Sequence, residues 1–203
     1  MDSSTIESEA DALLTLKDAT GAGLSSWSAA DKDGVCSWEG VTCDAASAIT
    51  ELDLSGEGLT GDITVAITSP FLASLQKVDL SNNAVKGDLS SILSGLPDLK
   101  YLDLSNNKDT VFGSLNGLET VGTALEYVDI SSNEDFKGDL GIFMADLVAA
   151  GTPLEVLDVS GTAVFGTIAA VPESLTYIQA LNTAAEGDCA SLDLEVCSFG
   201  PQQ

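Results

Sequence analysis

The sequence predicts an α/β repeat solenoid, an arc with a parallel β-sheet on its concave side and short helices on its convex side. A seven-residue phrase returns six times, starting at residues 49, 75, 99, 125, 154 and 175, so its copies begin 21 to 29 residues apart. One copy reads Leu99-Lys-Tyr-Leu102-Asp-Leu104-Ser. Apolar residues at the fourth and sixth positions alternate with polar ones, which is the period of a β-strand. A single such strand cannot bury its apolar side alone, so the copies must stack into one sheet.

This period and this phrase are the signature of a leucine-rich repeat. In the three central repeats the strand is followed by Asn83, Asn107 or Asn133. We expect each side-chain amide to bond the backbone of the neighbouring turn and so to satisfy buried polar groups. Four apolar segments have helical or 3₁₀ spacing and are expected on the convex side: residues 71–75, 92–96, 115–121 and 142–149.

The first 48 residues have the features of a cap for the open end of the stack. Residues 12–17 form a short amphipathic helical pattern, and Trp27 and the box Cys36-Ser-Trp38-Glu-Gly40-Val41-Thr-Cys43 follow. These elements resemble the N-terminal cap of plant-type extracellular leucine-rich repeat proteins, such as receptor-kinase ectodomains and polygalacturonase-inhibiting proteins. The repeats match the pattern L-x-x-L-D-L-S-x-N-x-L-x-G-x-I of the same class, although the proline that usually follows it is absent. The resemblance implies a non-enzymatic protein that binds proteins, peptides or glycans.

We therefore expect one continuous solenoid domain with an N-terminal cap at 1–48, leucine-rich repeats at 49–181 and a C-terminal cap at 182–203. The four cysteines allow three connectivities. Local pairing of Cys36 with Cys43 and of Cys189 with Cys197 is favoured, because the repeats hold the two ends of the chain apart. A metal site is the rival interpretation, but the chain has no histidine and no C-x-x-C motif.

The charge and the cysteines limit the partners and the compartment. Seven basic and 32 acidic residues give a net charge of −25, which repels nucleic acids and anionic membranes. Disulfides imply an oxidising compartment, so we expect an extracellular or cell-surface location. The chain opens without the features of a signal peptide, and we expect that this segment is absent from the sequence given. No stretch is long enough to insert directly into a membrane, and we expect a monomer.

Residues two apart on a strand share a face, so the third and fifth positions of each repeat should point onto the concave side. We call the third positions the aromatic row: Glu51, Lys77, Tyr101, Tyr127, Val156 and Tyr177. We call the fifth positions that hold aspartate the aspartate row: Asp53, Asp79, Asp103, Asp129 and Asp158. Tyr101 and Tyr127 occupy adjacent repeats, and tyrosine combines a large apolar face with a polar tip, as binding hot spots require. We expect the ligand to bind along these two rows.

Other interpretations remain open for the same residues. Tyrosine also favours strands and could simply shield the sheet. The aspartate row could raise some of its own pKa values or attract a cation, although Ca²⁺ needs several oxygens that converge on one point. Phe112 and Phe165, on the side of the solenoid, could form a second contact patch, but packing between repeats is the favoured expectation.

The favoured function is a secreted or cell-surface recognition module that binds a protein, peptide or glycan on its concave face. The alternative is a structural or cation-handling acidic surface protein without a specific macromolecular ligand. Catalysis is disfavoured, because the absence of histidine excludes His-based triads and His-metal sites, and no P-loop, G-x-G-x-x-G or G-x-S-x-G motif is present. No cofactor and no bound metal are expected.

Overall fold

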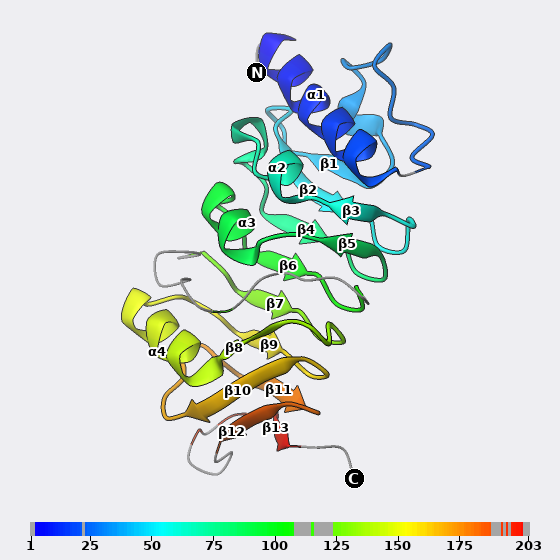
Figure 1. Ribbon diagram of the computed structural model, residues 1–203. Helices are drawn as coiled ribbons and strands as arrows, with labels where there is room; N and C mark the ends of the chain where they lie inside the picture. The colour runs from blue at the N-terminus through cyan, green and yellow to red at the C-terminus, as the bar shows by residue number, and fades with distance from the viewer. Residues whose placement is uncertain are drawn as a thin grey trace.

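The computed structural model is a stack of rungs that runs from an N-terminal helix to the C-terminal strand (Figure 1). It describes residues 3–21, 23–107, 115, 124–187, 192, 194 and 196–200. The main sheet has eight strands in the order β1-β2-β4-β6-β7-β9-β11-β13. Their bounds are β1 Val41–Cys43, β2 Ile49–Asp53, β4 Lys77–Asp79, β6 Tyr101–Asp103, β7 Tyr127–Asp129, β9 Val156–Asp158, β11 Tyr177–Leu181 and β13 Val196–Gly200. The predicted α/β solenoid with a parallel sheet is confirmed.

The sheet is wider than the six repeat phrases predict, because each end of the chain adds a strand. At the N-terminal edge, β1 pairs with β2 and runs antiparallel to it. At the C-terminal edge, β13 continues the sheet in parallel with β11. The segment beyond the last repeat thus extends the sheet rather than only covering it. Neither added strand carries the repeat phrase.

Short strands on the side of the solenoid form two further sheets, which the sequence analysis did not predict. The first pairs β3 (Thr60–Asp62) with β5 (Ala84–Lys86). The second has the order β12-β10-β8, from β8 (Lys137–Asp139), β10 (Ala163–Ile168) and β12 (Ala184–Gly187). Phe165, in β10, is 47% exposed, so the expectation that it packs between repeats was wrong. Phe112 lies outside the described residues.

Helices α2, α3 and α4 follow one another along one side of the stack, and α1 lies across its N-terminal end (Figure 1). Their bounds are α1 Ser3–Thr20, η1 Val35–Ser37, α2 Thr64–Ile67, η2 Pro70–Leu72, α3 Leu89–Gly95 and α4 Leu140–Ala150. The apolar segments at 71–75, 92–96 and 142–149 each overlap a helix, whereas α2 was not predicted and 115–121 lies almost entirely outside the described residues. One continuous apolar core extends from α1 to β12. No helix in the described part of the chain is long and apolar enough to cross a membrane.

The N-terminal cap is fixed by two tryptophans and one disulfide. The rings of Trp27 and Trp38 are stacked with centroids 5.6 Å apart, and Cys36 is bonded to Cys43 as predicted. Gly40, in the box between the two cysteines, has φ +73°, and a Cβ there would collide with the carbonyl oxygen of Asp53. The Asp53 N–H in turn donates to Gly40 O at 2.8 Å, so the glycine lets the cap approach the first repeat closely. In the C-terminal segment Cys197 is disulfide-bonded, and its expected partner Cys189 lies outside the described residues.

Asparagine side chains join each turn to the preceding repeat, as predicted. Asn133 is 1% exposed, and its Nδ2 donates to the carbonyl oxygens of Leu104, Ile130 and Ser131 at 3.0, 2.8 and 3.1 Å. Its Oδ1 accepts from the N–H of Asn107 at 3.2 Å. Asn107 and Asn83 repeat this pattern one and two rungs earlier, respectively. Each amide thus satisfies buried carbonyls in two consecutive rungs and holds those rungs in register.

Replacing Asn133 by alanine should lower the free energy of unfolding by about 3 kcal/mol, because buried carbonyls in two rungs lose their donor. Urea denaturation monitored by circular dichroism measures this change. Asn106→Ala is the matched control, since Asn106 lies in the neighbouring rung with φ +55° and its side-chain amide donates, among the described residues, only to Asn82 Oδ1. The control should cost about 1 kcal/mol, mainly from the positive φ. Equal losses in the two variants would contradict the role assigned to the buried amide.

Candidate functional site

The main sheet brings the residues of the aromatic row side by side across its strands. Each pair of neighbours in the row is in direct parallel register, from Glu51 beside Lys77 at one end to Val156 beside Tyr177 at the other. On β13, Val196 extends the row beyond Tyr177, and it is 40% exposed. The structure therefore assembles the row as predicted and adds one apolar position that the repeat phrase did not reveal.

Two tyrosines in the middle of this row form a stacked pair. The ring centroids of Tyr101 and Tyr127 lie 4.2 Å apart, and the ring planes differ by 8°. On the outer side of the pair, Lys77 Nζ lies 5.4 Å from the Tyr101 centroid and 3.3 Å from Asp53 Oδ2. Val156 separates Tyr127 from Tyr177 in the row. All three tyrosines are partly exposed, so the pair presents its ring edges and hydroxyl groups along the concave face.

The aspartate row runs beside the aromatic row and has a structural role at the ends of the strands. The Oδ1 of each aspartate accepts a hydrogen bond from the N–H of the serine two residues later, at 2.8 to 3.4 Å. These bonds close the turn that follows each strand. Of the five, only Asp53 forms an ion pair among the described residues.

The centre of the aspartate row is electrostatically strained. Burial, together with the negative charges of Asp103 and Asp158, raises the pKa of Asp129 to about 6 despite its hydrogen bonds from Ser131. Burial is also the main cause that raises the pKa of Asp103, followed by the charges of Asp79 and Asp53. The pKa of Tyr101, Tyr127 and Tyr177 is raised by burial and by nearby aspartates, so their hydroxyls stay protonated at neutral pH. Repulsion within the row thus contributes as predicted, but burial contributes more.

The described residues contain no group of three or more carboxylate, cysteine or histidine side chains that could hold a metal ion. The aspartates stand one per strand, each directed to its own serine, and do not converge on one point. Because Ca²⁺ requires such convergence, the aspartate row does not form a Ca²⁺ site in this arrangement.

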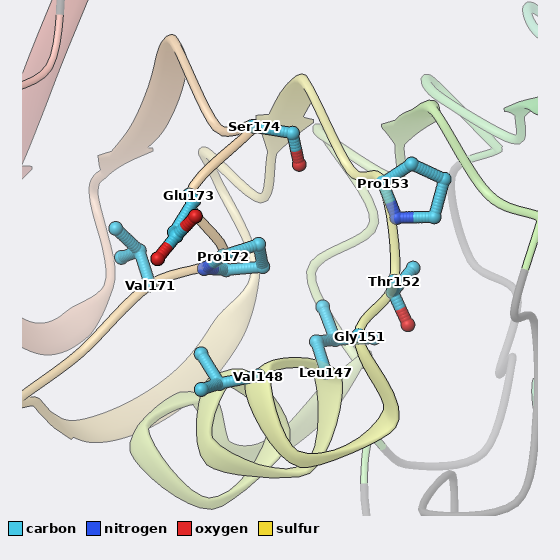
Figure 2. Close-up of a pocket in the computed structure, with 9 residues that line it drawn as sticks. All are labelled: Leu147, Val148, Gly151, Thr152, Pro153, Val171, Pro172, Glu173 and Ser174. Atoms are coloured by element: carbon cyan, nitrogen blue, oxygen red, sulfur yellow. The ribbon is translucent and has the colours of Figure 1, made fainter.

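A separate groove of about 360 Å³ lies at the C-terminal end of α4 (Figure 2). Leu147 and Val148 form one wall, and Val171 and Pro172, from the segment before β11, lie opposite. Thr152 is among the residues that line the groove. Its hydroxyl is buried and has no hydrogen-bond partner among the described residues. The groove was not predicted, because its lining residues come from α4 and from two connecting segments outside the repeat phrase. It contains none of the predicted binding residues.

The raised pKa of Asp129 predicts how stability depends on pH. The folded state binds this proton more tightly than the unfolded state, so the contribution of Asp129 to stability is greatest below pH 4 and is lost as pH rises through about 6. Asp129→Asn keeps an acceptor for Ser131 and removes the charge. We expect it to raise the free energy of unfolding at pH 7 by about 1–3 kcal/mol, with no gain at pH 3.5.

Urea denaturation at the two pH values tests this expectation. Asp146→Asn, on α4, makes the same change in net charge away from the aspartate row and should have an effect below about 0.5 kcal/mol at both. A gain of the same size in both variants would show that net charge alone, rather than the site of Asp129, is responsible.

Comparisons with known proteins agree with this architecture. The family model for the leucine-rich repeat N-terminal domain matches residues 6–44, and a model for two copies of the leucine-rich repeat matches residues 73–120. The leucine-rich repeat receptor-like serine/threonine-protein kinase SKM1 of Arabidopsis thaliana is 44% identical over 54 residues. That match covers 26% of this chain and 6% of the kinase, so the chain corresponds to a small part of that relative.

Solved structures show the same fold over nearly the whole chain. Pollen Receptor Kinase 3 superposes with a TM-score of 0.71 at 24% identity, covering 94% of this chain and 93% of that one. The ectodomain of the Arabidopsis receptor kinase HAESA, solved with a peptide hormone ligand, superposes with a TM-score of 0.59 at 22% identity. The superposition covers 89% of this chain and 34% of the HAESA chain. The chain therefore has the fold of a capped leucine-rich repeat solenoid, with family-model matches in its N-terminal cap and its repeats and a fold similar to that of Pollen Receptor Kinase 3.

Proposed function

We propose that this protein is an extracellular recognition module that binds a protein or peptide ligand on its concave face. The observation that carries the proposal is the stacked pair of Tyr101 and Tyr127, near the middle of the main sheet, where both side chains are partly exposed. Two packed aromatic rings lose little conformational entropy on binding and offer both apolar edges and hydroxyl groups. Such groups are enriched among the residues that dominate binding energy at interfaces.

The arrangement of the rings favours a peptide or protein over a glycan. Sugars stack on the open faces of aromatic rings, but Tyr101 has Lys77 on one side and Tyr127 on the other. Of the ring faces of this stacked pair, only the outer face of Tyr127 has neither Lys77 nor another tyrosine beside it. The HAESA ectodomain, which shares this fold, was solved with a peptide hormone, and this supports the same class of ligand here. The net charge of −25 disfavours nucleic acid as a partner.

The compartment is part of the proposal. The Cys36–Cys43 disulfide in the cap fits an oxidising environment outside the cytosol. The similarity to receptor-kinase ectodomains supports the same location. We propose a protein that acts as a monomer in the extracellular space or at the cell surface.

Affinity capture from an extract of the source organism tests the proposed function. The baits are the wild-type protein, Tyr101→Ala/Tyr127→Ala, and a control that also loses two exposed rings, Phe71→Ala/Phe165→Ala. We expect a partner that the wild type and the control retain and that the tyrosine variant loses at least tenfold, because only that variant removes the stacked pair. Mass spectrometry identifies the partner, and circular dichroism verifies that each bait is folded.

Three outcomes would contradict the proposal in whole or in part. Equal capture by all three baits would place the binding surface elsewhere on the molecule. Loss of capture with the phenylalanine control alone would move the site to the helical side and to β10. A captured glycan would keep the concave face as the site and overturn the ligand class.

A further inference from the structure

The two outer faces of the tyrosine stack differ in what lies beside them. Beyond Tyr101 lies Lys77, with Nζ 5.4 Å from the ring centroid. The same Nζ is 3.3 Å from Asp53 Oδ2, in the next strand. The protein thus places one of its own cations between a tyrosine face and a carboxylate of the aspartate row. This arrangement combines a cation–π contact with an ion pair.

Beyond Tyr127 the row continues with Val156 and then Tyr177. Because valine is much shorter than tyrosine, the row steps down between two tyrosines. We call this position the Val156 step. The strands that carry Tyr127 and Tyr177 are two spacings apart, or about 10 Å, which is wide enough for one planar group and its packing partners. The outer face of Tyr127 is directed toward this step, because its other face is stacked on Tyr101.

Two carboxylates lie at the edge of the Val156 step. Asp129 and Asp158 follow Tyr127 and Val156 by two residues on the same strands, so they share the face and lie about 7 Å along it. Neither forms an ion pair among the described residues. Lys77 is three strands away from Val156, or about 14 Å, and already pairs with Asp53. The step therefore has the ring face and the carboxylates of the Lys77 arrangement, but the described residues place no cation there.

We propose that the Val156 step binds an arginine side chain of the ligand, with its guanidinium on the outer face of Tyr127 and its N–H groups donating to Asp129 and Asp158. Arginine fits better than lysine, because its planar group stacks on a ring and its five donors can serve two carboxylates at once. Its aliphatic stem would pack over Val156. The raised pKa of Asp129 supports this assignment, since a cation beside that carboxylate would lower the pKa again. This inference rests on the proposed function and deepens it by specifying a side chain of the ligand.

The probe is a blocked pentapeptide with a central arginine between glycine and serine residues, titrated into the protein and followed by NMR. Its partner is the same peptide with citrulline, which keeps the shape of arginine and loses the charge. We expect the arginine peptide to shift the ring signals of Tyr127 and Tyr177 and to lower the pKa of Asp129. The citrulline peptide should bind at least fivefold more weakly, and added salt should weaken only the arginine peptide.

Val156→Lys places a cation of the protein itself at the step, as Lys77 does beside Tyr101, and should weaken the arginine peptide at least fivefold. Val65→Lys is the matched control, because Val65 is 84% exposed on α2 and the change in net charge is the same. The control should change the affinity less than twofold. Equal weakening by the two lysines would overturn the inference and leave only attraction by the net charge. Equal binding of the arginine and citrulline peptides would also overturn it, because the charge of the side chain would then play no part.

The inference and the proposed function can fail separately. If the captured partner requires Tyr101 and Tyr127 but Val156→Lys captures it unchanged, the proposed function stands and the arginine site is wrong. If capture does not depend on the tyrosines and the arginine peptide gives no shift at Tyr127, both are wrong.

Discussion

The stacking of rungs by buried asparagine amides is the interaction on which the rest of this structure depends. Each amide donates to carbonyls in its own rung and in the rung before, so consecutive strands cannot slip without leaving buried carbonyls unpaired. Register is what turns a sequence spacing of 26 residues into the stacked contact between Tyr101 and Tyr127. A slip of one residue between β6 and β7 would leave the two rings on opposite faces of the sheet. The buried asparagine bonds beside the sheet therefore determine which side chains lie next to each other on the concave face.

The concave face concentrates charge in a way that does not serve stability. Five aspartates stand in one row, and burial and mutual repulsion raise the pKa of Asp103 and Asp129. Among the described residues, Asp53 is the one aspartate of the row whose charge is balanced by a side chain of the protein, Lys77. The other aspartates lie beside the aromatic row without an ion-pair partner among the described residues, so a cationic group of a ligand could balance their charge. Perturbed pKa values of this kind cluster at functional sites.

The repeat phrase predicted the fold and the rows of the candidate site, because a period of two decides which face each residue occupies. Positions 3 and 5 of six copies were enough to place Tyr101, Tyr127 and the aspartates side by side. The strands β3, β8 and β12 were beyond this reasoning, because each is three or four residues long, contains a glycine and lacks alternating apolar residues. β13 pairs with β11 through backbone groups without repeating the phrase. The exposure of Phe165 depends on that side sheet, so it could not be read from the sequence either.

Site-specific photo-crosslinking tests most directly whether the concave face is the binding surface. The photoreactive residue p-benzoylphenylalanine would replace Tyr177, which lies in the same row and leaves the stacked pair intact, in one protein and Phe71, on the helical side, in the other. Crosslinks to the captured partner should form from position 177 and not from position 71, and the crosslinked segment should contain an arginine. Crosslinks from position 71 alone would contradict the assignment of the concave face.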